Sequence, residues 1–254
     1  MPNESPAGLS RVLAVVPAHD EAPRIAAVVR GAGMHLPVLV VDDGSSDATA
    51  RLAREAGAEV LEQRPNAGKG AALRAGFRHA LEAGYDGALT LDGDGQHDPA
   101  EIPAFLAAFA IAEAPPRQTA QPSDDATPRR PDLVVGQRDF SHMPPARRLA
   151  NTVGGQAFSW AVGTHVPDNQ SGYRLVGRRL MEASLASSEH GFEFEVEILA
   201  TCIANGWPIA WVPIRTIYTG GPSHIQPAAH ARHFFRAVAA ARRTVREARR
   251  TART

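Results

Sequence analysis

The first half of the chain alternates short β-branched runs with amphipathic helical patterns, and this alternation limits the possible folds more than any other feature. The runs that predict strands are Val12–Val16, Val38–Val41, Ala58–Leu61 and Ala88–Leu91. Between them, apolar residues recur at the spacing of one helix face. Because a helix separates consecutive strands, the strands are expected to run parallel. The sequence therefore predicts an α/β fold, a mostly parallel sheet with helices on both faces.

The second half of the chain is less regular. It follows a proline-rich segment, residues 112–131, which predicts a mobile loop rather than a linker between domains. A length of 254 residues fits one large domain with an appendage. We therefore expect one large domain over residues 1–227, followed by a helix over 228–254. The elements expected after the loop are a strand at 133–135, helices at 147–162, 178–186 and 193–205, and an edge-like strand at 209–218 interrupted by Pro213.

Positive charge is concentrated at the end of the chain. Residues 228–254 contain eight Arg and one Glu, although the whole chain has a net charge of zero. Apolar residues recur here at near-heptad spacing, so the segment predicts a basic amphipathic helix, which can lie on an anionic membrane surface. The alternatives are a helix that packs on the domain and a contact between copies of the chain. We expect no nucleic-acid partner.

The cellular compartment is predicted from two absences in the sequence. Cys202 is the only cysteine, which fits a reducing compartment. No secretory signal is recognised, and no window approaches the ~18 apolar residues that a membrane span needs. We therefore expect a cytoplasmic protein, with peripheral contact at the inner face of the membrane through residues 228–254.

Polar clusters follow three of the predicted strands. They are residues 17–21 (PAHDE), 42–47 (DDGSSD) and 92–98 (DGDGQHD). Ligands of open α/β sheets bind beyond the carboxyl ends of the strands. A single cluster is explained equally well by turn formation, but three clusters at one edge of a sheet favour a shared pocket.

The Asp92-Gly93-Asp94 segment predicts a metal site. Two carboxylates that alternate with glycine can reach one point, and hard oxygen ligands suit Mg²⁺ or Mn²⁺. Gln96 offers a further neutral oxygen. A plain Asp-Gly turn is the alternative. A calcium EF-hand loop is excluded, because a strand precedes the segment and Pro103 stands where that loop needs a bidentate Glu.

Residues 66–70 (NAGKG) resemble a glycine-rich phosphate loop at the start of a helix. The segment is not a Walker A motif, because no Ser or Thr follows the lysine. A helix N-terminus beside a lysine still suits an anion. Lys69 is the only lysine among 27 basic residues, and this favours a functional role over a surface turn.

Taken in order, these motifs resemble the family 2 glycosyltransferases, which are inverting enzymes with the Rossmann-like GT-A fold. The branch they resemble most is that of the dolichyl- and polyprenyl-phosphate sugar synthases, and the resemblance covers roughly residues 12–225. Its signatures P-x-Y-N-E, V-D-D-G-S-x-D, N-x-G-K-G, D-x-D-x-Q-H-x-P, G-S-R and D-x-x-S-G-F-R correspond to residues 17–21, 41–47, 66–70, 92–99, 136–138 and 168–174.

The resemblance implies roles for individual residues. It implies a divalent metal that bridges the donor's diphosphate, and two arginines, Arg138 and Arg174, that face the acceptor phosphate or the donor diphosphate. His19 and Asp20 replace the usual Tyr and Asn, so the donor is expected to be either a GDP-sugar or a UDP-sugar. The residues implied for the nucleoside are Pro17, His19, Glu21 and Asp43, and those for the metal are Asp92, Asp94 and Gln96.

The expected chemistry follows from the charge that develops on the leaving group. A metal and Lys69 would stabilise the departing nucleoside diphosphate. A phosphate acceptor, which we expect to be a polyprenyl phosphate, is already anionic and needs no strong base. A hydroxyl acceptor would need a carboxylate base, for which Asp168, with Glu195 behind it, is the candidate. Two further alternatives are a sugar-phosphate nucleotidyltransferase and a nucleotide-sugar-binding protein without activity.

Overall fold

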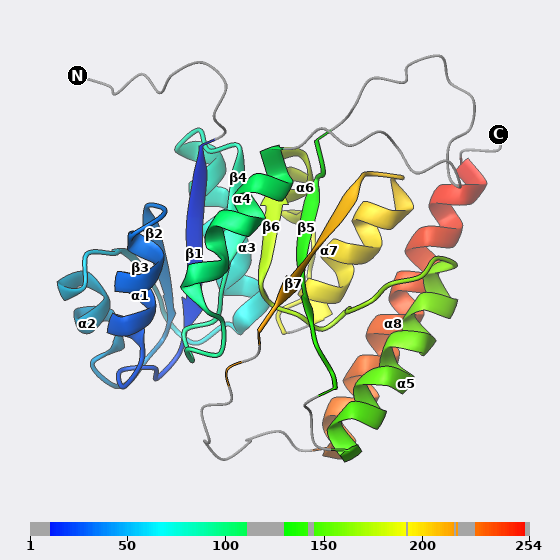
Figure 1. Ribbon diagram of the computed structural model, residues 1–254, viewed down its shortest axis with the longest axis horizontal. Coiled ribbons are helices and arrows are strands. Elements are labelled where there is room, and N and C mark those ends of the chain that lie inside the picture. Colours follow the sequence, from blue (N-terminus) through cyan, green and yellow to red (C-terminus); the bar gives the residue numbers. More distant parts are fainter. Residues whose placement is uncertain are drawn as a thin grey trace.

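The computed structural model shows one seven-stranded sheet between two layers of helices (Figure 1). The structure describes residues 11–110, 130–141, 145–191, 193–215, 217 and 227–251. The strand order is β3-β2-β1-β4-β6-β5-β7. The strands are β1 (Val12–Ala18), β2 (Val38–Asp43), β3 (Glu59–Gln63), β4 (Gly87–Thr90), β5 (Leu133–Arg138), β6 (Arg174–Gly177) and β7 (Ile209–Ile214).

The sheet is parallel except at β6. β1 pairs in parallel with β2 and β4, and β2 with β3, so the predicted parallel α/β arrangement of the first half is confirmed. β6 is antiparallel to both β4 and β5, which the sequence analysis did not anticipate. β7 lies at the edge of the sheet, as expected for a strand that contains Pro213, although it ends at Ile214.

Helices cover both faces of this sheet, as predicted. One face packs against α1 (Ile25–Gly33), α2 (Thr49–Glu55) and α4 (Ile102–Ala110), with the short η1 (Pro99–Glu101) before α4. The other face packs against α3 (Lys69–Glu82), α6 (Arg178–Ser184) and α7 (Glu193–Ala204). Consecutive residues of each strand alternate between the two hydrophobic cores: Leu13 and Val15 belong to one, Ala14 and Val16 to the other.

Two long helices extend the second layer at one end of the molecule. α5 (Pro145–Val162) and α8 (Pro227–Thr251) lie side by side beyond α7 (Figure 1). α8 is the basic amphipathic helix expected from the sequence, and several of its apolar side chains pack against the fold, although Phe235 is exposed. Ala237, Val238, Ala241 and Val245 are buried in the same core cluster as α7. The helix therefore packs on the rest of the fold, and its arginines make up much of the side that remains exposed.

Two sequence-based expectations concern segments at the limits of the structure. Most of the predicted mobile loop, residues 112–129, lies outside the described residues. Within the described part of the chain, no helix is both long and apolar enough to cross a membrane.

Candidate active site

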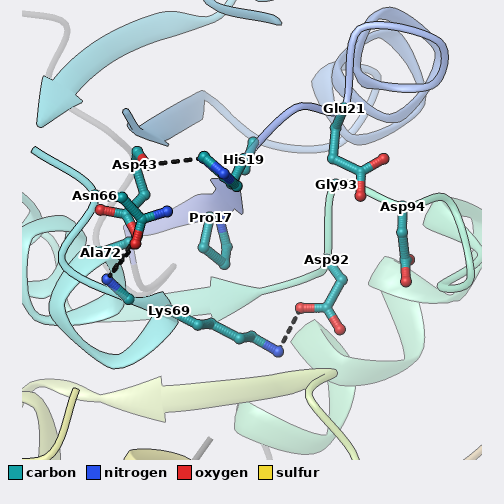
Figure 2. Close-up of a pocket in the computed structure, with 12 residues that line it drawn as sticks. Pro17, His19, Glu21, Asp43, Asn66, Lys69, Ala72, Asp92, Gly93 and Asp94 are labelled. Carbon is teal, nitrogen blue, oxygen red and sulfur yellow. Dashed lines mark hydrogen bonds and ion pairs between the residues drawn. The ribbon is translucent and has the colours of Figure 1, made fainter. Parts of the chain in front are cut away.

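A cleft of about 340 Å³ opens beyond the carboxyl ends of β1, β2 and β4 (Figure 2). This is the edge of the sheet at which the sequence placed a shared pocket. The cleft brings together most of the residues expected to bind donor or metal. Pro17, His19, Glu21, Asp43, Lys69, Asp92 and Asp94 line it, with Asn66, Gly68 and Gly93 between them.

The first two polar clusters tie the loop after β1 to the loop after β2. The Asp20 carboxylate accepts the Ser46 backbone N–H at 2.8 Å, and the Glu21 backbone N–H donates to Thr49 Oγ1 at 2.8 Å. Asp47 Oδ2 accepts the Ala22 backbone N–H at 3.1 Å. The hydrogen bond from the Ser46 backbone, with smaller contributions from its neighbours, lowers the pKa of the Asp20 carboxyl. These bonds therefore hold together the two loops that carry His19, Glu21 and Asp43 into the cleft.

Asp43 holds the glycine-rich turn that precedes α3. Its two carboxylate oxygens accept the backbone N–H groups of Ala67 and Gly68 at 2.8 and 2.7 Å. His19 Nδ1 lies 3.0 Å from the Asp43 carbonyl oxygen. Because a carbonyl only accepts, Nδ1 carries the proton of this bond. Asp43 thus positions both Lys69, at the start of α3, and the His19 ring.

The turn before α3 leaves no room for a side chain at Gly68. This residue has a φ of 93°, and a Cβ there would lie 2.5 Å from the His190 carbonyl oxygen. The Gly70 N–H donates to the same oxygen at 2.7 Å. The phosphate-loop resemblance thus has a structural cause, since the glycines let the chain before α7 pack directly on the start of α3.

Lys69 lies between two carboxylates at the floor of the cleft. Its Nζ is 2.6 Å from Asp92 Oδ1 and 3.1 Å from Glu195 Oε1; Figure 2 shows the contact with Asp92. Burial alone would lower the pKa of the Lys69 ammonium, but the two carboxylates outweigh it and raise that pKa. Burial would likewise raise the pKa of Asp92, but Lys69 and His97 outweigh it and lower that pKa. The pair is therefore fully charged at neutral pH.

The loop after β4 presents its carboxylates to this cleft. Asp94 is part of the cleft lining and accepts from Gln96, through the backbone N–H at 2.9 Å and the side-chain amide at 2.7 Å. His97 is buried and accepts the Asp92 N–H on Nδ1 at 3.0 Å. Burial lowers the pKa of His97, so the ring stays neutral and fixes the Asp92 backbone.

The carboxylates of Asp92 and Asp94 fit a divalent metal. In this structure the Lys69 ammonium occupies the position of a cation beside Asp92. Among the described residues, no group of three or more acidic, His or Cys side chains is close enough to hold a metal by itself. Two carboxylates suit Mg²⁺ or Mn²⁺ that takes its other ligands from phosphate and water. Gln96, the third expected ligand, does not line the cleft and donates its amide to Asp94 instead.

Arg138 and Asp168 form an ion pair next to the sheet. Arg138 donates from Nε and Nη2 to the two oxygens of Asp168, at 2.7 and 2.9 Å. Asp168 is 2% exposed and also accepts the Gln170 backbone N–H. Both oxygens of the expected alternative base are therefore occupied by a cation. Neither residue lines the cleft.

Arg174 is placed differently from the expectation that it faces a phosphate. It is 1% exposed, and its guanidinium donates to the backbone carbonyls of Ser171, Asn169 and Glu195. Burial lowers the pKa of this group. In this arrangement Arg174 fixes the loop before β6 against the start of α7.

Sequence reasoning gave too little weight to two residues that do not line the cleft but support it. Glu195 was considered only as a reserve base, whereas it contacts Lys69. Thr90, the last residue of β4, donates its hydroxyl to the Gly172 carbonyl at 2.8 Å and so holds Gly172 above the cluster. The sequence did contain a signal for Glu195, a charged residue in the apolar helical pattern of 193–205.

Comparison with known proteins decides the family. The sequence model of glycosyl transferase family 2 matches residues 13–157, more than half of the chain. The chain belongs to this family. Polyprenol monophosphomannose synthase of Mycolicibacterium smegmatis is 30% identical over 223 residues, which cover 80% of this chain and 76% of that protein. Undecaprenyl-phosphate mannosyltransferase of Micrococcus luteus is 30% identical over 219 residues, 80% of this chain and 82% of that protein.

Solved structures agree on the fold. Glucosyl-3-phosphoglycerate synthase of Mycobacterium tuberculosis, in complex with Mn²⁺, UDP-glucose and phosphoglyceric acid, superposes with a TM-score of 0.69. The match covers 92% of this chain and 80% of that chain at 18% identity. The GT-A fold and the predicted branch of family 2 are therefore confirmed. The protein is a glycosyltransferase that uses a nucleotide sugar, and not the nucleotidyltransferase or the inactive binding protein kept as alternatives.

Proposed function

We propose that this family 2 enzyme transfers a hexose, with inversion, from a GDP- or UDP-sugar to a polyprenyl phosphate, and that it needs Mg²⁺ or Mn²⁺. The observation that carries the proposal is the charge arrangement in the cleft, where Lys69 lies against Asp92 and Asp94 is close by. Two relatives are named for mannosyl transfer to polyprenyl or undecaprenyl phosphate, which supports this acceptor class.

The charged residues of the cleft and the residues near β2 would have different roles. Asp92 and Asp94 would hold the metal, which supplies positive charge to the diphosphate leaving group. Lys69 contributes a further fixed positive charge on the same side. His19 and Pro17 line the part of the cleft nearer β2, next to Asp43 and Asn66, and there they would contact the nucleoside.

The state of Asp168 favours a phosphate acceptor over a hydroxyl acceptor. A hydroxyl would need a carboxylate that is free to take its proton. Asp168 is bound through both oxygens to Arg138, and Glu195 lies against Lys69. A phosphate monoester carries its own negative charge and needs no such base.

The test is a transfer assay with radiolabelled GDP-mannose and a panel of UDP-sugars, undecaprenyl phosphate and either metal. We expect labelled lipid with one nucleotide class, no product in EDTA, and β product from an α-linked donor. Asp94→Ala should abolish transfer without lowering the melting temperature, because Asp94 lies in a loop and fills no core volume. Glu55→Ala, at an exposed position of α2, is the matched control. Full activity of Asp94→Ala at saturating metal would contradict the metal role.

Peripheral membrane contact, which we also propose, would use the outer side of α8. Its apolar face is buried against α7, so attachment would depend on the exposed arginines, among them Arg243 and Arg246. Each basic residue near an anionic surface contributes about 1 kcal/mol. The double substitution Arg243→Glu and Arg246→Glu should therefore reduce co-sedimentation with phosphatidylglycerol vesicles but not with phosphatidylcholine vesicles. Equal co-sedimentation of variant and parent with both vesicle types would contradict this role.

A further inference from the structure

Three segments that are distant in the sequence meet at one charge cluster. Lys69 is the first residue of α3, Asp92 follows β4, and Glu195 lies in the first turn of α7. The lysine ammonium is 2.6 Å from one carboxylate and 3.1 Å from the other. The cluster therefore contains one cation between two anions, and one of those anions is the proposed metal ligand.

The backbone at Gly172 closes this cluster on one side. A Cβ at this position would lie 2.9 Å from Glu195 Oε1 and 3.1 Å from both Asp92 Oδ2 and Lys69 Nζ. The three charged atoms are thus gathered around one backbone position. Thr90 holds that position through the Gly172 carbonyl.

The carboxylate of Glu195 depends on Lys69 for its direct ion pair. Glu195 is 7% exposed, and a buried carboxylate is costly unless a cation or hydrogen bonds compensate it. Within the described part of the chain, the ammonium of Lys69, 3.1 Å from Glu195 Oε1, is the side-chain cation in direct contact with this carboxylate. Arg174 donates to the backbone carbonyl of this residue, and its guanidinium also attracts the carboxylate electrostatically.

We propose that Lys69 and a divalent cation compete for Asp92, and that Glu195 is the positioning residue that retains the Lys69 ammonium when the metal binds. This inference rests on the proposed metal role of Asp92. A dication that approaches Asp92 meets the ammonium already paired with it, and the two cations repel. Glu195 lets the ammonium shift within the cluster without losing its counter-ion, so Lys69 stays available to the diphosphate.

The two roles of Lys69 predict effects of opposite sign. Lys69→Met removes the competitor but keeps the aliphatic stem. In the absence of nucleotide, we expect it to bind Mn²⁺ about tenfold more tightly than the parent protein, as measured by electron paramagnetic resonance of free Mn²⁺. At saturating Mn²⁺, the same variant should bind GDP or UDP more weakly by calorimetry. A residue that only supports the fold would weaken both.

A double-mutant cycle tests Glu195 specifically. Glu195→Gln should weaken Mn²⁺ binding about fivefold in the parent background and less than about twofold in the Lys69→Met background, because its effect acts through Lys69. Glu55→Gln, on the exposed side of α2, is the control for a lost surface charge. Equal weakening by Glu195→Gln in both backgrounds, or no gain in Mn²⁺ affinity in Lys69→Met, would overturn the proposal.

A sugar-transfer assay of the parent protein, in the same preparations, distinguishes failure of this inference from failure of the proposed function. Active parent protein with an unchanged Lys69→Met affinity overturns the competition alone. Both the proposed function and the competition predict that Asp92→Asn loses Mn²⁺ binding. If Asp92→Asn still binds Mn²⁺ as the parent does, both are overturned.

Discussion

Gly172 is the residue on which the geometry of the charge cluster depends most directly. A methyl group there would lie within 2.9 to 3.1 Å of three charged atoms, closer than such contacts normally come. Its φ is not in the left-handed region, so the constraint is contact and not backbone strain. Gly172→Ala should therefore lower kcat/KM at least about tenfold, since small displacements of catalytic groups are costly. Gly155→Ala, where a Cβ meets nothing within 4 Å, should retain full activity.

The Arg138–Asp168 pair gives a stability prediction at the same scale. Removing the arginine leaves a carboxylate that is 2% exposed without its cation. Arg138→Ala should lower the free energy of unfolding by about 3 kcal/mol, as for other broken buried pairs. Urea denaturation measures the loss, and the exposed Arg148→Ala should change it by less than about 0.5 kcal/mol.

Single residues differ in how far the sequence reveals them. Ordered motifs in the sequence made it possible to predict Asp92, Asp94 and Lys69. The structure places all three residues in one cleft. Arg174 could not be predicted in the same way, because the pattern D-x-x-S-G-F-R identifies an arginine but not the direction of its side chain. That direction is set by three backbone carbonyls, which only the folded loop brings together.

Among the elements, the two loops joined by Asp20, Ser46 and Asp47 give a pH dependence. Hydrogen bonding lowers the pKa of Asp20, chiefly from the Ser46 backbone. At Asp47, burial would raise the pKa of the carboxyl, but hydrogen bonds from Thr49 and Ala22 outweigh burial and lower that pKa. A depressed folded-state pKa contributes stability above the usual value of 3.8, and this stability is lost as the pH falls through the folded pKa. Between pH 5 and about pH 2.5, the melting temperature of Asp47→Asn should therefore fall less than that of the parent. Parallel curves would contradict this origin.

The packing of α8 predicts that substitutions on its buried face lower stability, whereas substitutions on its exposed face do not. Val245 is 2% exposed and belongs to the core shared with α7, whereas Arg246 is exposed. Val245→Asp buries an unpaired carboxylate and should lower the free energy of unfolding by about 3 kcal/mol or more. Arg246→Asp, one residue further on, should leave it nearly unchanged in the same urea titration.

Elements of the first half could be predicted almost completely, and those of the second half only in part. The strand–helix alternation fixes parallel pairing in the first half, because each crossover helix returns the chain in the same direction. β6 has only four residues, and the loop at 163–173 separates it from α5, so no local pattern signals its antiparallel direction. The apolar repeat in 228–254 predicted a helix correctly but did not show what would cover its apolar face.

At the scale of the whole molecule, residues from both halves of the chain contribute to the charge cluster at the cleft. The family match ends at residue 157, yet Gly172 and Glu195 reach the same charge cluster as Asp92. The sheet order explains this, because β6 is inserted beside β4. The part of the chain beyond the family match therefore contributes directly to the electrostatics of the cleft.

This shared cluster has a consequence for protein engineering. A chimera that joins residues 1–157 to the second half of another family member exchanges Glu195, a partner of Lys69, together with the rest of that half. If the incoming half lacks a carboxylate at the position of Glu195, the lysine retains Asp92 as its sole counter-ion. Under the proposed competition such a swap would alter the demand for metal, and position 195 should be grafted together with residues 1–157.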